Sequence, residues 1–406
     1  MRRRRTRRIA AWAAAGLLGC AGGAPAQTPL FPPDRLSRLQ KGITDIYNLE
    51  YARAMENFQD MIRQSPEDPA GYVYLAATYW IQELSAKQEL SIDRFAASDF
   101  FSESRKYVVP VDPAAEARFR QLSQQAVEKA RRVVETSPQD RAALFLLGLA
   151  YQNLASFESA LKRNWWSAFR LGSKTYRHHR DLLRRDPEFH DARLATGVYQ
   201  YVAGSLGWNV KWVAFLMGYH GSRERGKQEL ETAARKALLA GDDARVILTL
   251  IHIREKNYQK AFDYLAELLR KYPQNYLVHL DMGGLALLMK RPEAAVEIYQ
   301  DILRKREAGA RKYAGIERAL ILNRLGAALR EKGDSQAAAG WFSQALAEPG
   351  ASARSTTIAR LELGKTLDGM GRRGEAVQHY RAVVAAEEVA GSRQEASELL
   401  RRPYRR

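Results

Sequence analysis

The stretch that decides the fold is residues 322–350, with the sequence LNRLGAALREKGDSQAAAGWFSQALAEPG. Apolar residues surround Gly326 at helical spacing, and the stretch continues with Ala338, Phe342, Ala345 and Pro349. A small residue lets two helices cross closely, and a large residue fills the space beside the crossing. A proline stops the second helix. The pattern therefore predicts a helical hairpin.

The same register recurs along most of the chain. Near the C-terminus it is repeated by Leu363, Gly364, Leu367, Ala376, Tyr380 and Val383. Upstream of the first stretch it is repeated by Gly283, Ala295, Tyr299, Ile302, Ala261, Leu265, Leu268 and Pro273. The N-terminal half repeats it with Ala54, Phe58, Met61, Pro66, Tyr72, Leu75, Ala76, Tyr79, Ala126, Ala130, Val133, Pro138, Leu144, Leu147, Gly148 and Tyr151. Self-similarity of this kind is the signature of a repeat architecture.

This pattern resembles the tetratricopeptide-repeat (TPR) family, whose helical hairpin unit is about 34 residues long. The resemblance extends from about Arg35 to Glu388. It implies an all-α fold, a right-handed superhelical array of about seven or eight TPR-like helical hairpins. The family's usual tryptophan in the first helix is replaced by residues such as Tyr72 and Leu144. Alternating apolar patterns are scarce, which argues against strands.

The N-terminus is typical of an export signal. Six arginines lie within the first eight residues, and an apolar run follows from Ile9 to Gly19, too short for a membrane-spanning helix. Residues 1–19 are therefore predicted to be a signal peptide. The segment 17–20 resembles the lipobox of bacterial lipoproteins, which implies lipidation of Cys20, the single cysteine. Cleavage after Ala26, giving a soluble periplasmic or secreted protein, is the alternative.

Composition suggests the remaining boundaries. Residues 20–34 are rich in Gly, Pro and Ala and predict a flexible tether. Residues 35–230 are expected to form N-terminal TPR-like helices with insertions at 81–113 and 197–226. Residues 231–390 are expected to form C-terminal TPR repeats, followed by a basic C-terminal tail at 391–406. The first insertion is interpreted as a simple extension, or as a lid over the concave face.

The second insertion is rich in glycine and aromatic residues. Its candidate partner-binding residues are Tyr201, Trp208, Trp212, Phe215 and Tyr219. These aromatics could fill the core between repeats, or form a groove for a partner peptide or helix, since Trp and Tyr dominate binding hot spots. A third interpretation is an interfacial wedge on a bilayer, with Arg223 and Arg225 near the head groups.

The sequence contains no persuasive catalytic, metal or cofactor motif. His178 and His179 are adjacent and point in different directions on a helix. The triplet from Gly364 to Thr366 lacks the earlier glycine of a phosphate-binding loop. Asp242 and Asp243 follow Gly241 and are interpreted as a helix N-terminal cap. We therefore expect no enzyme activity, no metal and no cofactor.

The charge pattern bears on the partners. The net charge is +18, of which +12 remains without the six N-terminal arginines. Acids and bases interleave, whereas nucleic-acid binders concentrate charge on one face, so no nucleic-acid partner is expected. The leading hypothesis is a non-catalytic TPR scaffold for protein–protein interaction in the bacterial cell envelope. Its concave surface would hold a partner segment, and its basic side chains favour acidic ones. The alternative is a membrane-contacting assembly or lipid-handling component of the envelope, attached through the lipid anchor.

Overall fold

The computed structural model describes residues 30–86, 111–205, 221–389 and 391–404. All regular elements in these ranges are helices, which confirms the all-α array of helical hairpins. The N-terminal half contains α1 (Pro33–Tyr47), α2 (Tyr51–Gln64), α3 (Pro69–Ala86), α5 (Pro113–Thr136), α6 (Arg141–Ala160), α7 (Trp165–Arg185), the short 3-10 helix η2 (His190–Ala192), α8 (Arg193–Ser205) and α10 (Arg223–Lys236).

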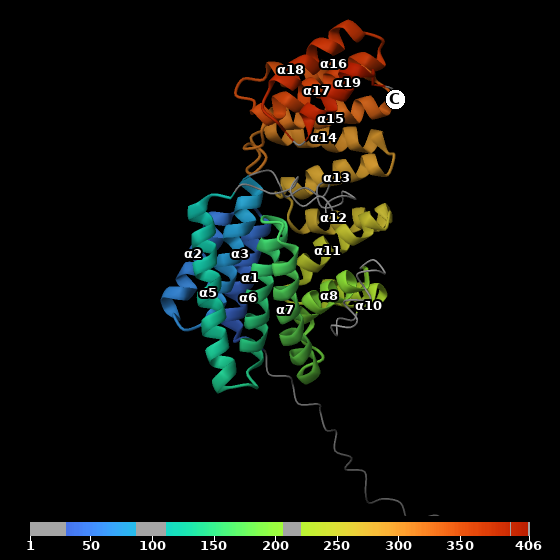
Figure 1. The fold of residues 1–406 in the computed structure, drawn as a ribbon. Coiled ribbons are helices and arrows are strands. Elements are labelled where there is room, and N and C mark those ends of the chain that lie inside the picture. The colour runs from blue at the N-terminus through green and yellow to red at the C-terminus, as the bar shows by residue number, and fades with distance from the viewer. Residues whose placement is uncertain (1–29, 87–110, 206–220, 390, 405–406) are drawn as a thin grey trace, which may run out of the picture.

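The C-terminal half continues the same alternation. It contains α11 (Gly241–Arg254), α12 (Tyr258–Lys271), α13 (Tyr276–Leu288), α14 (Pro292–Glu307), α15 (Arg318–Lys332), α16 (Ser335–Ala347), α17 (Ala353–Gly369), α18 (Arg373–Ala385) and α19 (Ser392–Arg401). In Figure 1 the helices α1 to α7 form one stack, and the helices from α11 to α19 rise beside it as a second stack. None of the described helices is long and apolar enough to cross a membrane.

Local sequence signals set the helix ends. The Asp140 side chain accepts a hydrogen bond of 2.8 Å from the backbone N–H of Ala143 at the start of α6. Asp334 does the same for Ala337 at the start of α16, at 3.0 Å. These N-cap bonds satisfy amides that have no partner inside the helix. At the end of α15, Gly333 has a φ of 101°, a left-handed conformation that glycine adopts without a steric cost.

The hairpins are held by a glycine that faces a ring. In the hairpins α1/α2, α13/α14, α15/α16 and α17/α18, the ring lies sixteen residues after the glycine, in the pairs Gly42–Phe58, Gly283–Tyr299, Gly326–Phe342 and Gly364–Tyr380. A Cβ at Gly326 would lie 2.8 Å from the nearest Phe342 carbon, closer than packed atoms approach. All four rings are fully buried. The predicted register is therefore correct for these hairpins.

The hairpin α6/α7 uses a histidine as its ring. A Cβ on Gly148 would collide with the imidazole of His179, which is 1% exposed. His179 stacks on Phe145 with 5.2 Å between the ring centroids. Its Nε2 lies 3.0 Å from the carbonyl oxygen of Phe145, and since a carbonyl only accepts, Nε2 carries the hydrogen. His179 is therefore a core residue of the repeat.

The glycines at the edges of the 197–226 segment serve helix packing. A Cβ on Gly226 would lie 2.5 Å from the backbone nitrogen of Tyr201, and one on Gly197 would lie 3.0 Å from the carbonyl oxygen of Gly226. The helices α8 and α10 thus touch backbone to backbone and pack as an antiparallel pair of the array. The predicted insertions begin inside helices, since α3 continues to Ala86 and α8 to Ser205. Residues 87–110 and 206–220 lie outside the described residues.

Two predicted boundaries need correction. The basic tail expected at 391–406 is largely the helix α19, whose Ala396 is fully buried. Arg373 of α18 holds it by donating hydrogen bonds to the carbonyl oxygens of Leu399 and Leu400, at 2.9 and 2.8 Å. The tether expected to reach residue 34 ends earlier, because Phe31 is 2% exposed and lies edge-on against Phe145. In both places one buried apolar side chain packs against the array where the local composition favours a segment without regular structure.

The first prediction tests the glycine crossing. We expect Gly326→Ala to lower the free energy of unfolding by about 1 kcal/mol or more, because the new methyl group overlaps Phe342. Gly326→Trp is expected to cost several times as much. The control is Gly340→Ala in α16, where a Cβ would meet no atom within 4 Å. That change should stabilise the helix by about 0.5–1 kcal/mol. Equal effects of the two alanines in chemical denaturation would contradict the assigned crossing.

The second prediction concerns pH. Burial lowers the pKa of His179 to about 4, from an ordinary value of 6.5. Between pH 7 and pH 4 the unfolded chain therefore binds a proton that the folded chain does not. The free energy of unfolding should fall over this range by on the order of 3 kcal/mol from this residue.

His179→Phe supplies a ring of the kind found in the other hairpins and should remove that part of the pH dependence. Urea unfolding of both proteins at pH 7 and pH 4 measures it. An identical loss of stability in the two proteins would show that His179 is not the titrating group.

Candidate binding surface

The first helix of the chain contacts the middle of the array. The Tyr47 ring, at the end of α1, stacks on Tyr272 with 4.9 Å between centroids and 16° between the ring planes. Its hydroxyl donates a hydrogen bond of 2.6 Å to Asp243. Asn275 donates one of 2.8 Å to the carbonyl oxygen of Tyr47. The chain therefore folds back, so that α1 lies against the loops and ends of α11, α12 and α13.

Charged groups extend this contact on both sides. Glu50, just after α1, forms ion pairs of 2.8 Å with Arg311 and 3.0 Å with Lys312, in the segment between α14 and α15. Gln40 donates a hydrogen bond of 3.3 Å to the carbonyl oxygen of Leu238. These partners are separated by about two hundred residues or more in sequence. The contact joins the N-terminal stack to the C-terminal one.

A buried carboxylate positions the turn between α10 and α11. Asp191 of η2 accepts hydrogen bonds from three consecutive backbone amides, those of Leu238, Leu239 and Ala240, at 3.2, 2.6 and 2.8 Å. Burial raises the pKa of Asp191, and the three amides oppose that rise. The turn is thereby fixed in front of α1.

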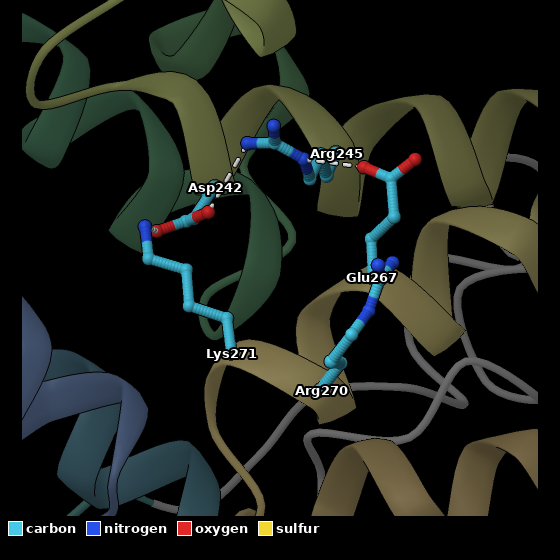
Figure 2. Close-up of a pocket in the computed structure, with 5 residues that line it drawn as sticks. All are labelled: Asp242, Arg245, Glu267, Arg270 and Lys271. Atoms are coloured by element: carbon cyan, nitrogen blue, oxygen red, sulfur yellow. Dashed lines mark hydrogen bonds and ion pairs between the residues drawn. The ribbon is translucent and has the colours of Figure 1, made fainter.

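Asp242, in the first turn of α11, is the centre of the surface (Figure 2). One carboxylate oxygen accepts hydrogen bonds of 2.6 Å from both Lys271 Nζ and the Tyr272 hydroxyl. The other oxygen accepts one of 3.2 Å from Arg245. Arg245 also donates from Nε to Glu267 at 3.0 Å. Asp242 is 5% exposed, and its burial among three donors fixes the direction of Arg245 and Lys271.

Two adjoining pockets open beside Asp242. One, of about 400 Å³, is lined by Asp242, Arg245, Glu267, Arg270 and Lys271 (Figure 2). The other, of about 370 Å³, lies between α1 and the ends of α10, α11 and α12. It is lined by Gln40, Ile43, Thr44, Ala234, Arg235, Ala237, Leu238, Leu239, Gly241, Asp242, Arg245, Lys271 and Tyr272. Because Asp242, Arg245 and Lys271 belong to both, the pockets form one continuous surface, which we call the α1–α12 surface.

Tyr201, a predicted binding residue, lies in the core. Tyr201 of α8 is 8% exposed and lies in a core cluster with Leu194 and Leu230. Its hydroxyl donates to Glu255 at 3.3 Å, and the same carboxylate binds Arg223 at 2.7 Å. The ring is therefore core, which corrects the prediction for this residue. Arg223, expected near lipid head groups, forms an ion pair with the same glutamate, which Lys227 also engages.

The other predicted site residues are not placed. Trp208, Trp212, Phe215, Tyr219 and the lipidation candidate Cys20 lie outside the described residues. The three interpretations of their segment stay predictions.

The interpretation of Asp242 and Asp243 as a helix cap is wrong. The N-cap position of α11 is Ala240, and neither side chain caps it. Asp191 binds the amides of the preceding turn instead, while Asp242 and Asp243 bind side chains of α12 and α1. The spacing of Asp242 and Arg245, three residues apart on a helix, was the one local signal of this site. No pattern of neighbouring residues indicates that Lys271 and α1 come close to Asp242 and Asp243.

The third prediction tests the fold-back of α1. Tyr47→Phe removes the hydrogen bond to Asp243 and should weaken the contact by about 1 kcal/mol. Tyr47→Ala also removes the stacked ring and should cost about 2 kcal/mol or more. Hydrogen exchange of the α1 amides measures the opening.

A matched control is Tyr258→Phe in α12, whose hydroxyl has no hydrogen-bond partner among the described residues. It should leave the exchange of α1 unchanged. If Tyr47→Ala does not speed exchange in α1, the contact does not hold this helix.

Comparison with known proteins agrees with this architecture. Family models described as tetratricopeptide repeat match residues 218–276 and 252–320. These two segments overlap and contain the helices α10 to α14. A search of curated proteins finds no match.

Several solved structures are similar to this chain. Yeast Tom70 is 11% identical, with 91% of this chain and 88% of that chain covered and a TM-score of 0.38. A human IFIT1 dimer with m7Gppp-AAAA is 13% identical, with 92% and 88% covered and a TM-score of 0.41. A tetratricopeptide repeat protein from Parabacteroides merdae is 12% identical, with 80% and 98% covered and a TM-score of 0.31. The two family matches identify tetratricopeptide repeats in residues 218–320, and the glycine–ring hairpins show the same helical-hairpin architecture on both sides of that segment.

Proposed function

We propose that this protein is a non-catalytic scaffold that binds a segment of a partner protein and acts in the bacterial cell envelope. The observation that carries the binding role is the α1–α12 surface, an open surface built jointly by two parts of a repeat array. Repeat arrays present extended surfaces of this kind to partners.

The use of the buried polar groups supports a non-catalytic role. A catalytic acid or base needs a titratable group that can reach a substrate. Asp191 is occupied by three backbone amides, and Asp242 by three side-chain donors. His179 is packed between Gly148 and Phe145. These groups stabilise the array, and their geometry offers no reacting position.

The cell-envelope part of the proposal rests on the N-terminal sequence. The arginine-rich start, the apolar run and Cys20 are the pattern of a lipoprotein signal. A lipid on Cys20 would attach the scaffold to the periplasmic face of a membrane. Cleavage after Ala26 would instead release it as a soluble protein.

The fourth prediction separates these two outcomes. In a bacterial host, the full chain should partition with the membrane fraction, and its mass should include a lipid. Cys20→Ser should move the protein to the soluble fraction, because a serine accepts no thioether-linked lipid. Full membrane partition of the Cys20→Ser protein would contradict lipid anchoring.

The scaffold role is tested by affinity purification of the full chain from envelope extracts, with mass spectrometry of what is recovered. We expect at least one protein enriched over an unrelated lipoprotein carrying the same tag. Recovery of no protein above that control, from a properly folded chain, would overturn the scaffold proposal.

A further inference from the structure

We infer that the α1–α12 surface binds an acidic segment of a partner protein that also presents an apolar side chain. This inference rests on the proposed scaffold function and adds the place and the chemistry of binding. It follows from the charge, the exposed apolar atoms and the internal contacts of the surface.

The charge of the surface favours an anionic partner. Four basic side chains line the two pockets, namely Arg235, Arg245, Arg270 and Lys271, against the two acids Asp242 and Glu267. Both acids are engaged by Arg245, and Asp242 also by Lys271. Arg235 and Arg270 are exposed, and no acidic group in the described parts of the chain lies within ion-pair distance of either. Two cations are therefore left for carboxylates of a ligand.

The apolar part of the surface lies next to these cations. Leu238 is 60% exposed, one of few large apolar side chains that are so open among the described residues. It lines the second pocket together with Ile43, Ala234, Ala237 and Leu239, of which Ala234 and Leu239 are buried and expose little surface. An exposed leucine gains stability when an apolar side chain of a partner covers it. The ligand should therefore combine acidic and apolar residues.

The composition of the surface favours a protein over a nucleic acid. Nucleic-acid strands bind to basic grooves through stacking of bases on exposed aromatic rings. Among the residues that the structure describes, the only ring lining either pocket is Tyr272, which is 2% exposed and already stacked on Tyr47. An exposed leucine has no role in binding phosphates. Pockets of about 370 and 400 Å³ have room for a few side chains of a peptide.

Internal contacts order the floor of the surface before the ligand arrives. Asp242 fixes Arg245 and Lys271 in place, and Asp191 fixes the turn that carries Leu238. The wall on the other side belongs to α1, which is held by Tyr47. A surface that is already ordered loses little entropy on binding. The site therefore depends on the closed arrangement of α1 and the middle of the array.

The fifth prediction is tested with defined peptides and the full chain. The probe is a fluorescein-labelled peptide of alternating Glu and Leu, followed by fluorescence anisotropy. Comparison probes alternate Glu and Ser, or Lys and Leu, and a labelled single-stranded oligonucleotide tests nucleic acid. The pocket variant is Arg235→Glu with Arg270→Glu. Its control is Arg381→Glu with Arg401→Glu, which changes the net charge equally at exposed sites on α18 and α19.

We expect the wild-type chain to prefer the Glu/Leu peptide. Reversal of the two pocket charges should weaken its binding by about ten-fold or more, and the control variant should change it by less than about two-fold. Leu238→Ser should weaken the Glu/Leu peptide and bring it level with the Glu/Ser peptide. Circular dichroism and thermal unfolding check that each variant is folded.

Three outcomes would overturn the inference. The first is an equal loss of binding in the pocket and control variants, which would mean general attraction to a basic protein. The second is preference for the oligonucleotide, and the third is no binding of the Glu/Leu peptide to the wild type.

Affinity purification with the pocket variant separates this inference from the scaffold role. If the wild type and the pocket variant recover the same partner equally, the inference fails and the scaffold function stands. If the wild type recovers none, the scaffold function fails, whatever the peptides show.

Discussion

Most hairpins of the array depend on the close crossing of two helices at a glycine, in five of them against a ring buried on the opposite helix. In four hairpins the ring lies sixteen residues after the glycine, because a tight turn joins two helices of similar length. In α6/α7 the helices are longer, and the ring is His179. In α8/α10 two glycines meet and the backbones touch. Each of these crossings brings the helix axes close enough to exclude water from between them. The next hairpin can then pack on the same surface.

A second constraint acts between hairpins. The chain returns on itself where Tyr47 of α1 stacks on Tyr272, and the α1–α12 surface exists because of that return. Two buried carboxylates make the junction specific. Asp191 orders the turn before α11, and Asp242 orients the basic residues. A buried charge needs several good donors, and each of these carboxylates has three. The same groups that stabilise the junction therefore shape the surface offered to a partner.

The outcome for individual residues shows where sequence reasoning succeeds. Gly326 with Phe342 and Gly364 with Tyr380 were predictable, because their spacing is local and recurs. The basic C-terminal tail is largely the helix α19, which Ala396 and the hydrogen bonds of Arg373 hold against α18, and its charged composition did not indicate this packing. Asp242 was interpreted as a cap because an aspartate just after a glycine at the start of a helix has the same sequence pattern whether it caps the helix or binds other side chains. Tyr201 was a candidate for binding, because an aromatic residue in a glycine-rich segment has the same pattern whether its ring is core or exposed.

By itself, the sequence determined the helices, their pairing into hairpins and the resemblance to a repeat family. These features depend on interactions between residues close in the chain, and periodicity records such interactions directly. Only the tertiary structure decided that α1 lies against α11, α12 and α13, that Asp242 gathers Arg245, Lys271 and Tyr272, and that Leu238 stays exposed beside them. The physical reason is that each of these contacts joins groups brought together by the cumulative geometry of many stacked hairpins. A small rotation at each crossing sets that geometry, and no local pattern of residues encodes its sum.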